Sequence, residues 1–593
     1  MSRRRVGVAL GLAVLAVTAV LFPFAAGGSP VVPSPEAAPP ETVAESRAAT
    51  ATEPQQPGAN VLVCPRPTKS RTAAPEPRIV ELYPNPTTRG NVGEFLVLET
   101  PPETSLGNWT ITDGHTTASL PNETVSGRIA VTTAPKETRG LTDERIVELE
   151  GTLRLAVDGD DLELRNGSKT LDAVSYDRAP TAERWYRRER ATDRNRTGDG
   201  NGRGTWWPRD ATCFPVSAVE TGEATAFVLP DSPDVPREAI RDADERLLLA
   251  GYTFTDDEIA DDLVAAADRG VDVAVLLESG PVGGTPRATE SVLETLEEGG
   301  VDVRVIGGEG ARYRFHHPKY AVADDAVVVT TENWKPSGVG GESSRGWGVR
   351  VENDALAADL AAVFRADFEG WDTRSGEAFR EDASFVEDDP TPARDFRTNH
   401  EPATVPVDSV ELLLAPENAE PRLRTLLEGA DDEILIKQAS IDADVSLLEA
   451  SVDAARRGVD VRILLDSSWY VEGENEALAA DLERTAAEEE LPLEVRVVDD
   501  ADGFEKVHAK GIVIDRETAV VGSANWNENS LRHNREVLLA LHGPEAASYY
   551  AAVFESDWEG ETWSLPIELS VTVVAALVCA ALVGRRYVRF GEE

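Results

Sequence analysis

Histidine, lysine and cysteine are scarce in this chain of 593 residues, which has seven histidines, three cysteines, and eight lysines against fifty arginines. His, Cys and carboxylate residues do not cluster at the spacing of metal ligands, so the sequence predicts neither a metal site nor a cofactor. A basic patch with interleaved aromatic residues, typical of nucleic-acid surfaces, is also missing. The few histidines and lysines are therefore informative where they recur together.

Negative charge dominates the composition. The chain has 106 Asp and Glu against 58 Lys and Arg, a net charge of -48, and the surplus is spread along its length. A diffuse acidic surface in which arginine replaces lysine favours solubility in high salt, so we expect a halophilic protein. An acidic protein from ordinary surroundings is the alternative. In molar salt the Debye length is about 3 Å, so the net charge does not exclude an anionic substrate.

Both ends of the chain have apolar runs typical of membrane segments. Residues 1–28 have the basic start, apolar stretch and small residues of a signal peptide or signal anchor. Residues 567–584 form a run long enough to span a bilayer, and the arginines of residues 585–593 predict a cytoplasmic tail. The sequence thus predicts a protein of the cell membrane, with the bulk of the chain extracellular.

Two further features agree with export. The three cysteines are Cys579, in the predicted membrane helix, and Cys64 and Cys213, which we expect to form a disulfide, with two free thiols as the alternative. The N-terminal third contains four Asn-x-Ser/Thr sites for glycosylation, at Asn108, Asn122, Asn166 and Asn195.

The region before residue 217 divides into two parts. Residues 29–74 are rich in Pro, Ala, Glu and Thr and predict a disordered stalk. Residues 75–216 contain short alternating strands such as "RIVELYP" and "GEFLVLET", which predict an all-β sandwich. This second part resembles the lamin-tail domain, an immunoglobulin-like sandwich that usually serves as an accessory module. The residues that carry the resemblance are Pro84, Asn85, Pro86, Gly93, Glu94, Phe95 and Trp109.

Residues 222–373 and 406–562 are two copies of one unit. The stretch "DERLLLAGYTFTDDEIADDLVAAADRGVDVAVLLES" from Asp244 aligns with "DEILIKQASIDADVSLLEASVDAARRGVDVRILLDS" from Asp432. Each copy reads as a strand, an amphipathic helix and a buried strand, so we predict a duplicated α/β fold with two lobes. The acidic, proline-containing residues 374–405 are expected to link the lobes.

Each copy contains a histidine followed two residues later by a lysine and seven residues later by an aspartate. On a strand, the histidine and lysine would project from the same face. Two such sets suit phosphodiester cleavage, in which one imidazole attacks phosphorus and the other protonates the leaving oxygen. A structural histidine, the usual explanation of a lone one, does not explain a duplicated set. The sets are His317, Lys319 and Asp324 with Asn333 beyond, and His508, Lys510 and Asp515 with Ser523 and Asn525 beyond.

This paired motif resembles the hallmark of the phospholipase D superfamily, and the resemblance covers residues 222–560. It implies one active site between two lobes, so that a monomer suffices, a phosphohistidine intermediate and no metal. His317 and His508 would be the nucleophile and the general acid/base, whereas Asp324 and Asp515 would be more structural. The phosphate-binding residues would be Lys319, Lys510, Asn333, Ser523 and Asn525.

The first copy departs from the superfamily pattern. Thr330-Thr331 stands in place of Gly522-Ser523, and the preceding strand is one residue shorter. Glu536 lies where the superfamily often keeps an acid that orients a catalytic imidazole, and Gly348 corresponds to it in the first copy. If such acids serve the opposite lobe, Glu536 supports His317 and His508 has no support. We therefore expect His317 to attack and His508 to act as acid and base.

The sequence thus predicts a membrane-anchored extracellular phosphodiesterase, with phospholipid or nucleic acid as its substrate and partner. Membrane tethering favours lipid, whereas lamin-tail modules on exported nucleases favour nucleic acid. The alternatives are a weak or inactive surface module that binds phosphate ligands, and a phosphatidyltransferase similar to cardiolipin synthase.

Overall fold

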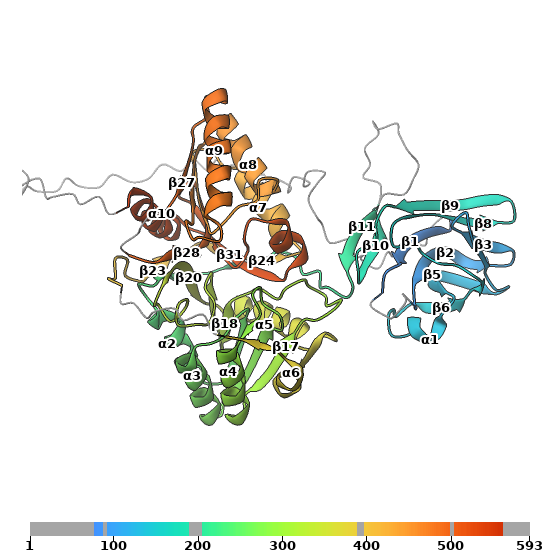
Figure 1. Cartoon of the computed structure of the whole chain (residues 1–593), viewed down its shortest axis with the longest axis horizontal. Coiled ribbons are helices and arrows are strands. Elements are labelled where there is room, and N and C mark those ends of the chain that lie inside the picture. Colours follow the sequence, from blue (N-terminus) through green and yellow to red (C-terminus); the bar gives the residue numbers. More distant parts are fainter. Residues whose placement is uncertain (1–75, 87–91, 189–203, 388–395, 499–502, 561–593) are drawn as a thin grey trace, which may run out of the picture. The chain divides into compact units, whose positions relative to one another are not determined.

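The computed structural model describes residues 76–86, 92–188, 204–387, 396–498 and 503–560 (Figure 1). The predicted signal, stalk, membrane helix and tail lie outside the described residues, as do Cys64, Cys579 and Asn195. Cys213 is disulfide-bonded, and its predicted partner Cys64 is among the residues not described. Within the described ranges, no helix is long and apolar enough to cross a membrane.

The N-terminal part is a β-sandwich. One sheet has the order β11-β10-β1-β2-β5-β6 and the other β7-β4-β3-β8-β9. Leu98 of the first sheet and Leu164 of the second lie in one hydrophobic core, so the two sheets pack face to face. The stretches "RIVELYP" and "GEFLVLET" form β1 and β2 as expected from their alternation, whereas the lamin-tail resemblance stays a prediction. Asn108, Asn122 and Asn166 are exposed.

The elements of this sandwich are β1 (Arg78–Tyr83), β2 (Phe95–Ser105), β3 (Trp109–Thr112), β4 (Thr117–Ser119), β5 (Thr124–Thr132), α1 (Pro135–Thr138), β6 (Arg145–Glu148), β7 (Glu150–Gly151), β8 (Asp160–Asn166), β9 (Lys169–Tyr176), β10 (Glu183–Arg187) and β11 (Gly204–Pro208).

Lobe 1 is built on a mixed sheet of order β21-β17-β15-β14-β18-β19-β20-β13-β23. Strands β14, β15 and β17 are parallel, and helices α3 and α4 make the crossovers between them. Leu263 of α3 and Leu293 of α4 share a core with Leu249 of β14, so these helices cover one face of the sheet (green in Figure 1). The elements are β13 (Glu223–Leu229), α2 (Asp234–Asp242), β14 (Arg246–Gly251), α3 (Asp257–Asp268), β15 (Asp272–Glu278), β16 (Thr285–Pro286), α4 (Arg287–Glu298), β17 (Asp302–Ile306), β18 (Tyr320–Ala323), β19 (Ala326–Thr330), β20 (Ser344–Glu352), α5 (Asp354–Phe368), β21 (Thr373–Ser375), α6 (Gly376–Asp382), β22 (Phe385–Val386) and β23 (Ala403–Pro406).

Lobe 2 repeats this topology, as the internal repeat predicts. Its sheet has the order β12-β24-β31-β30-β29-β25-β26-β27, in which β25, β26 and β27 are the parallel strands. The elements are β12 (Ser217–Glu220), β24 (Ser409–Ala415), α7 (Ala419–Glu428), β25 (Glu433–Gln438), α8 (Ser446–Arg457), β26 (Asp460–Leu465), α9 (Glu472–Glu489), β27 (Leu493–Val497), β28 (Lys506–Val507), β29 (Lys510–Ile514), β30 (Thr518–Gly522), a π-helical turn (Asn529–His533), β31 (Glu536–His542) and α10 (Pro544–Glu559).

The two lobes share a central hydrophobic core. Leu360 of α5 and Tyr550 of α10 lie in one cluster with Val349 of β20 and Leu539 of β31. Helices α5 and α10 therefore pack against strands of both sheets. This shared core brings the ends of β20 and β31, with the loops beside them, to the interface between the lobes.

The boundaries of the lobes differ from those expected. The predicted linker 374–405 contains α6, and strands β21 and β23 at its two ends pair with β17 and β13 of lobe 1. Strand β12, which precedes lobe 1 in the chain, pairs with β24 of lobe 2. Each lobe thus receives an edge strand from the segment that leads into the other, an exchange that alternation alone does not reveal.

Candidate active site between the two lobes

The aspartates of the two motifs tie neighbouring strands together. Asp324, in the turn between β18 and β19, accepts hydrogen bonds from the backbone N–H groups of residues 244–246 at 2.8–2.9 Å. Asp515 accepts the same three bonds from residues 431–433 at 2.8–3.0 Å. Because these carboxylates are occupied by backbone donors, both aspartates are structural in this geometry.

Each motif histidine is paired with a carboxylate from the opposite lobe. Nδ1 of His317 lies 2.9 Å from Oε2 of Glu536, the first residue of β31. Nδ1 of His508 lies 3.1 Å from Oε2 of Glu332, two residues after β19. A carboxylate only accepts hydrogen bonds, so each Nδ1 carries the proton and each Nε2 is the reactive nitrogen. Neither lobe has a complete site by itself.

The expectation that His508 has no supporting acid is wrong, because Glu332 supplies one. The carboxylate of Glu332 is fully buried. Burial by itself would raise the pKa of Glu332, but His508 and the nearby lysines bring it below its usual value. The acid is therefore ionised and able to orient the imidazole.

The counterpart of Glu536 in lobe 1 is Gly346 and not Gly348. The N–H of each motif histidine donates to the carbonyl of an arginine in the opposite lobe, Arg345 or Arg535, at 3.0 Å. Gly346 and Glu536 directly follow these arginines. A Cβ on Gly346 would lie 2.3 Å from Cγ of Glu332. The side chain of Glu332 thus fills the space that a glutamate at Gly346 would need.

The expectation of a strand one residue shorter in the first copy is wrong, because β19 and β30 each have five residues. The missing residue is lost from the turn, which spans 324–325 between β18 and β19 but 515–517 between β29 and β30. The hydroxyl of Thr331 accepts the N–H of Trp347 at 3.0 Å. In lobe 2 the hydroxyl of Ser523 accepts the equivalent bond from Val537 at 3.1 Å.

The predicted phosphate ligands differ in their surroundings. Ser523 is fully buried and donates its hydroxyl to Glu536 at 2.5 Å, so in this structure it supports the acid and is not available to phosphate. Asn333 is buried, with its side-chain oxygen unpaired, and Asn525 is partly buried. The two asparagines occupy equivalent positions of the two lobes.

Four of the eight lysines lie around the two histidines. Lys319 and Lys510 each donate to the carbonyl of their own motif histidine, at 2.5 and 2.6 Å. Burial lowers the pKa of Lys319, and the charges of Lys510 and Lys335 lower it further. Burial lowers the pKa of His508 to about 3, with Lys510 and Lys506 contributing. In a chain of net charge -48, this is a local concentration of positive charge suited to phosphate.

Comparison with known proteins agrees with this geometry. The family model described as cardiolipin synthase, PLD-like domain, matches residues 237–368 and 423–558, one segment in each lobe. Cardiolipin synthase B of Salmonella typhi is 27% identical over 335 residues, which cover 51% of this chain and 72% of that protein. The two lobes thus contain the PLD-like domain of the phospholipase D superfamily.

Other known proteins match over shorter stretches or by structure alone. Phospholipase D Y of Dictyostelium discoideum is 32% identical over 150 residues, which cover 24% of this chain and 31% of that protein. The structure of phosphatidylserine synthase from Haemophilus influenzae has a TM-score of 0.43 and 14% identity, covering 61% of this chain and 94% of that one. Nuc from Salmonella typhimurium, a phospholipase D family member, has a TM-score of 0.23 and 21% identity, covering 27% of this chain and 98% of that one.

The phospholipase D-like site contains residues that sequence reasoning missed. The ring of Tyr252 packs edge-on against His317, with 4.6 Å between centroids. Glu278 and Asp466 each accept, at 2.7 Å, the N–H of the residue just before a motif histidine. The signal for these two acids is in the repeat, because an acid ends the buried strand in both copies, "VLLE" and "ILLD". Tyr252 has no comparable signal.

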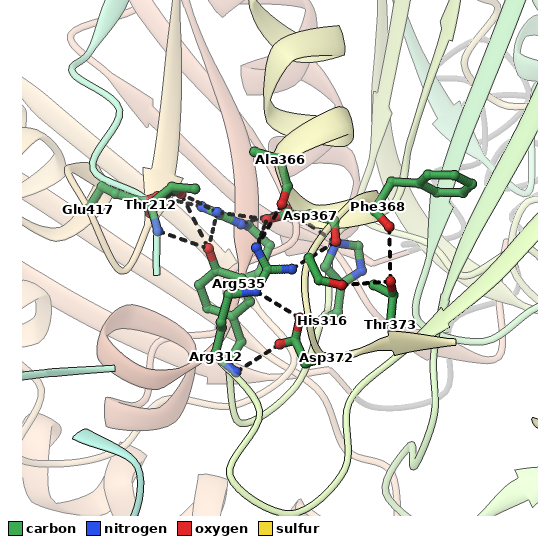
Figure 2. Close-up of polar contacts among 12 residues, drawn as sticks. Thr212, Arg312, His316, Ala366, Asp367, Phe368, Asp372, Thr373, Glu417 and Arg535 are labelled. Carbon is green, nitrogen blue, oxygen red and sulfur yellow. Dashed lines mark hydrogen bonds and ion pairs between the residues drawn. The ribbon is translucent and has the colours of Figure 1, made fainter. Parts of the chain in front are cut away.

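A buried arginine next to Glu536 links the two lobes (Figure 2). Arg535 is fully buried and donates two hydrogen bonds to Asp367 of α5, at 2.8 and 3.0 Å, and one to Glu417 at 2.7 Å. Its guanidinium lies 4.3 Å from the centroid of the Tyr313 ring. Because Arg535 belongs to lobe 2 and Asp367 to lobe 1, this bidentate pair holds the lobes in register beside the site.

Lobe 1 contains the equivalent contact. Arg345, also fully buried, lies 2.5 Å from Asp231 and 3.1 Å from Asp557 of α10 in lobe 2. Arg345 and Arg535 occupy the same position in the two copies. The lobes are therefore joined by two related ion pairs, each made by an arginine whose carbonyl binds the N–H of one motif histidine.

Arg535→Met should lower the free energy of unfolding by about 3–5 kcal/mol, because Asp367 and Glu417 would lose the cation that binds both buried carboxylates, leaving Asp367 only the more distant Arg312, at 4.0 Å. Denaturant unfolding in molar salt measures the change. The control is Arg484→Met, which removes a solvent-exposed pair with Asp481 and should leave the midpoint in place. Equal midpoints for the two variants would contradict the role given to Arg535.

The pH dependence follows from opposite requirements of two groups. Burial lowers the pKa of His317 to about 4 and that of Lys510 to about 8. His317 must be deprotonated to attack, so kcat/KM on bis-p-nitrophenyl phosphate, whose leaving group needs no proton, should rise through about pH 4. Lys510 must be protonated to hold phosphate, so the rate should fall through about pH 8.

Lys510→Arg should remove the part of the alkaline fall that lies near pH 8, because a guanidinium stays protonated throughout this range, while Lys319, whose pKa is also lowered, keeps its own titration. The acid limb belongs to His317 and should remain near pH 4. A pH profile of kcat/KM for the wild type and the variant checks both statements. An alkaline limb that stays near pH 8 in the variant would show that Lys510 is not the group responsible.

Proposed function

We propose that this chain is a phosphodiesterase that cleaves its substrate through a phosphohistidine on His317. The observation that carries the proposal is the reciprocal pairing, in which His317 binds Glu536 and His508 binds Glu332 across the lobe interface. Two oriented imidazoles among lysines match the needs of a two-step displacement at phosphorus. Superfamily members act on phosphodiester bonds, which supports the same reaction class.

In the first step, Nε2 of His317 attacks phosphorus with its lone pair, and the bond from phosphorus to the leaving oxygen breaks. His508 gives a proton to that oxygen. Burial and the nearby lysines lower the pKa of His508, and the negative charge of a bound phosphodiester opposes this effect and favours protonated His508. In the second step, His508 takes a proton from water, whose oxygen attacks phosphorus and releases His317. Lys319 and Lys510 neutralise the non-bridging oxygens in both steps.

A phosphatidyltransferase is the second candidate. The same site would serve if the hydroxyl of a lipid alcohol, in place of water, attacked the phosphohistidine. Its support is that two kinds of relative are named for synthase reactions, cardiolipin synthase and phosphatidylserine synthase. We further propose that the enzyme is exported and held at the membrane by residues 567–584, with phospholipid or nucleic acid as its substrate.

The test uses the full-length protein in molar salt with EDTA. The substrates are bis-p-nitrophenyl phosphate, phosphatidylglycerol vesicles and single-stranded DNA. We expect turnover that resists EDTA and is lost in His317→Asn but kept in the control His115→Ala, which alters an exposed histidine of the sandwich. Phosphatidic acid as the lipid product would indicate hydrolysis, whereas cardiolipin with released glycerol would indicate transfer. No turnover of any substrate would contradict the proposal and favour a phosphate-binding module.

A further inference from the structure

Bare apolar side chains protrude from two loops at the site. Trp469 is 88% exposed, Val282 79% and Tyr470 50%, and in the described ranges no other large hydrophobic residue is as exposed as these three. Trp469 and Tyr470 lie between β26 and α9, and their rings pack edge-on with 5.8 Å between centroids. Val282 lies in the equivalent loop of lobe 1, after β15.

Contacts link the loop of Val282 to His317. The N–H of Val282 donates to the hydroxyl of Tyr252 at 2.5 Å. The ring of Tyr252 in turn packs against the His317 imidazole. The loop starts after Glu278, whose carboxylate holds the N–H of the residue before His317.

The loop of Trp469 and Tyr470 is linked to His508 in the corresponding way. It starts at Asp466, whose carboxylate holds the N–H of the residue before His508. One apolar loop from each lobe thus stands beside each histidine.

The chemistry of these exposed side chains favours a lipid surface, and not a polyanion, as their binding partner. Trp and Tyr concentrate where hydrocarbon meets head groups, because their rings are apolar and their N–H or O–H groups are polar. Helix α9 begins at Glu472, two residues after Tyr470, and its first turn contains the exposed Glu472 and Glu474. A phospholipid brings one phosphodiester to the lysines and its acyl chains to the apolar tips, whereas the successive phosphates of a nucleic acid would lie against carboxylates instead of cations at the start of α9.

Chain length supports the same partner. Helix α10 of lobe 2 ends at Glu559, and the predicted membrane span begins at residue 567. The seven residues between them reach at most about 25 Å. A span at that position would keep lobe 2, which carries Trp469 and Tyr470, close to the bilayer.

We propose that Trp469, Tyr470 and Val282 form an interfacial surface that inserts into the head-group region of a phospholipid bilayer and presents the site to membrane-borne phosphodiesters. This inference deepens the proposed function by naming the substrate class, and its effect on turnover rests on that function. Insertion itself does not depend on catalysis.

The experiment compares the double variant Trp469→Ala/Tyr470→Ala with wild type, both as full-length protein reconstituted in phosphatidylglycerol vesicles. The control Trp371→Ala removes a partly exposed tryptophan of lobe 1 that packs under Arg209. Two readouts are taken: quenching of tryptophan fluorescence by lipids brominated on their acyl chains, and turnover of phospholipid, single-stranded DNA and water-soluble bis-p-nitrophenyl phosphate. Quenching reports insertion even where there is no turnover.

We expect the double variant to lose the part of the quenching that Trp469 contributes, but not that of Trp563 beside the predicted span, and to turn over phospholipid about tenfold more slowly or worse. Turnover of the soluble diester should stay within about twofold of wild type, and the control should match wild type in both readouts. Unchanged quenching in the double variant would overturn the inference, as would a selective loss of DNA cleavage, which would indicate base stacking. Wild-type protein that is quenched but turns over none of the substrates would support insertion and contradict the proposed function.

Discussion

His317→Asn should eliminate turnover of bis-p-nitrophenyl phosphate, by about 10⁴-fold or more, whereas His508→Asn should release about one equivalent of p-nitrophenol and then stall. Without His317 no nucleophile reaches phosphorus. Without His508 the first step still proceeds, because p-nitrophenolate leaves without a proton. The phosphohistidine then persists, because no base activates water. Asparagine leaves a polar partner for the buried Glu536 or Glu332.

Stopped-flow absorbance with known active-site concentrations measures the burst. A substrate with an alkyl leaving group should give no burst in His508→Asn, since an alkoxide needs the proton of His508. If His317→Asn gave the burst and His508→Asn gave none, the two histidines would have the opposite roles. If neither variant gave a burst and both kept turnover, the covalent pathway itself would be wrong.

Glu332→Ala should lower kcat on phospholipid by roughly 10²- to 10⁴-fold, because His508 loses the group that orients it and stabilises its protonated form. Adding Gly346→Glu should restore most of the loss. The three nearest contacts of a Cβ at Gly346 are all atoms of Glu332, so removing that side chain opens the space. The acid would then stand where Glu536 stands in the other lobe.

Gly346→Glu alone is the matched control, and it should be as harmful as Glu332→Ala because the two side chains would collide. A harmful single change that becomes beneficial beside a second harmful one measures the coupling between the positions. A role in stability alone predicts a different result, in which kcat follows the unfolding midpoint of each variant. Failure of the double variant to recover, despite a wild-type midpoint, would contradict the assignment of Glu332.

The repeated chemistry could be predicted from the sequence because it depends on local spacing. His317, Lys319 and Asp324 lie within eight residues, and a second copy in a chain poor in His and Lys made the pattern specific. The duplicated α/β topology was predictable for the same reason, since its buried strands and amphipathic helices are continuous segments with a clear period.

Glu332 could not be found by matching the two copies position by position. A carboxylate can reach the same place from a different residue when its side chain is long and the facing residue is glycine. The available signal was an acid within the hydrophobic run "VVVTTENW", where the second copy has Ala524. Alignment instead compared Glu536 with Gly348, two residues beyond the true counterpart, because the strand pairing that identifies Gly346 is a tertiary fact.

The arginines and edge strands show a second limit. Arg345 and Arg535 recur in "SRGW" and "NREV", but an arginine in an Arg-rich acidic protein usually lies on the surface. Only the fold shows that both are buried between carboxylates of the two lobes. Strand β12 leads into lobe 1 but pairs with lobe 2, and β23 leads into lobe 2 but pairs with lobe 1. A short alternating segment does not specify which strand it will pair with.

The most direct test of the account is to locate the covalent intermediate. His508→Asn is incubated with bis-p-nitrophenyl phosphate, digested at neutral to alkaline pH to preserve the phosphoramidate, and analysed by peptide mass spectrometry. The account predicts a mono-p-nitrophenyl phosphoryl group on the peptide that contains His317, and none in the double variant that also has His317→Asn. A group on another residue, or turnover with no protein-bound phosphoryl group, would contradict it.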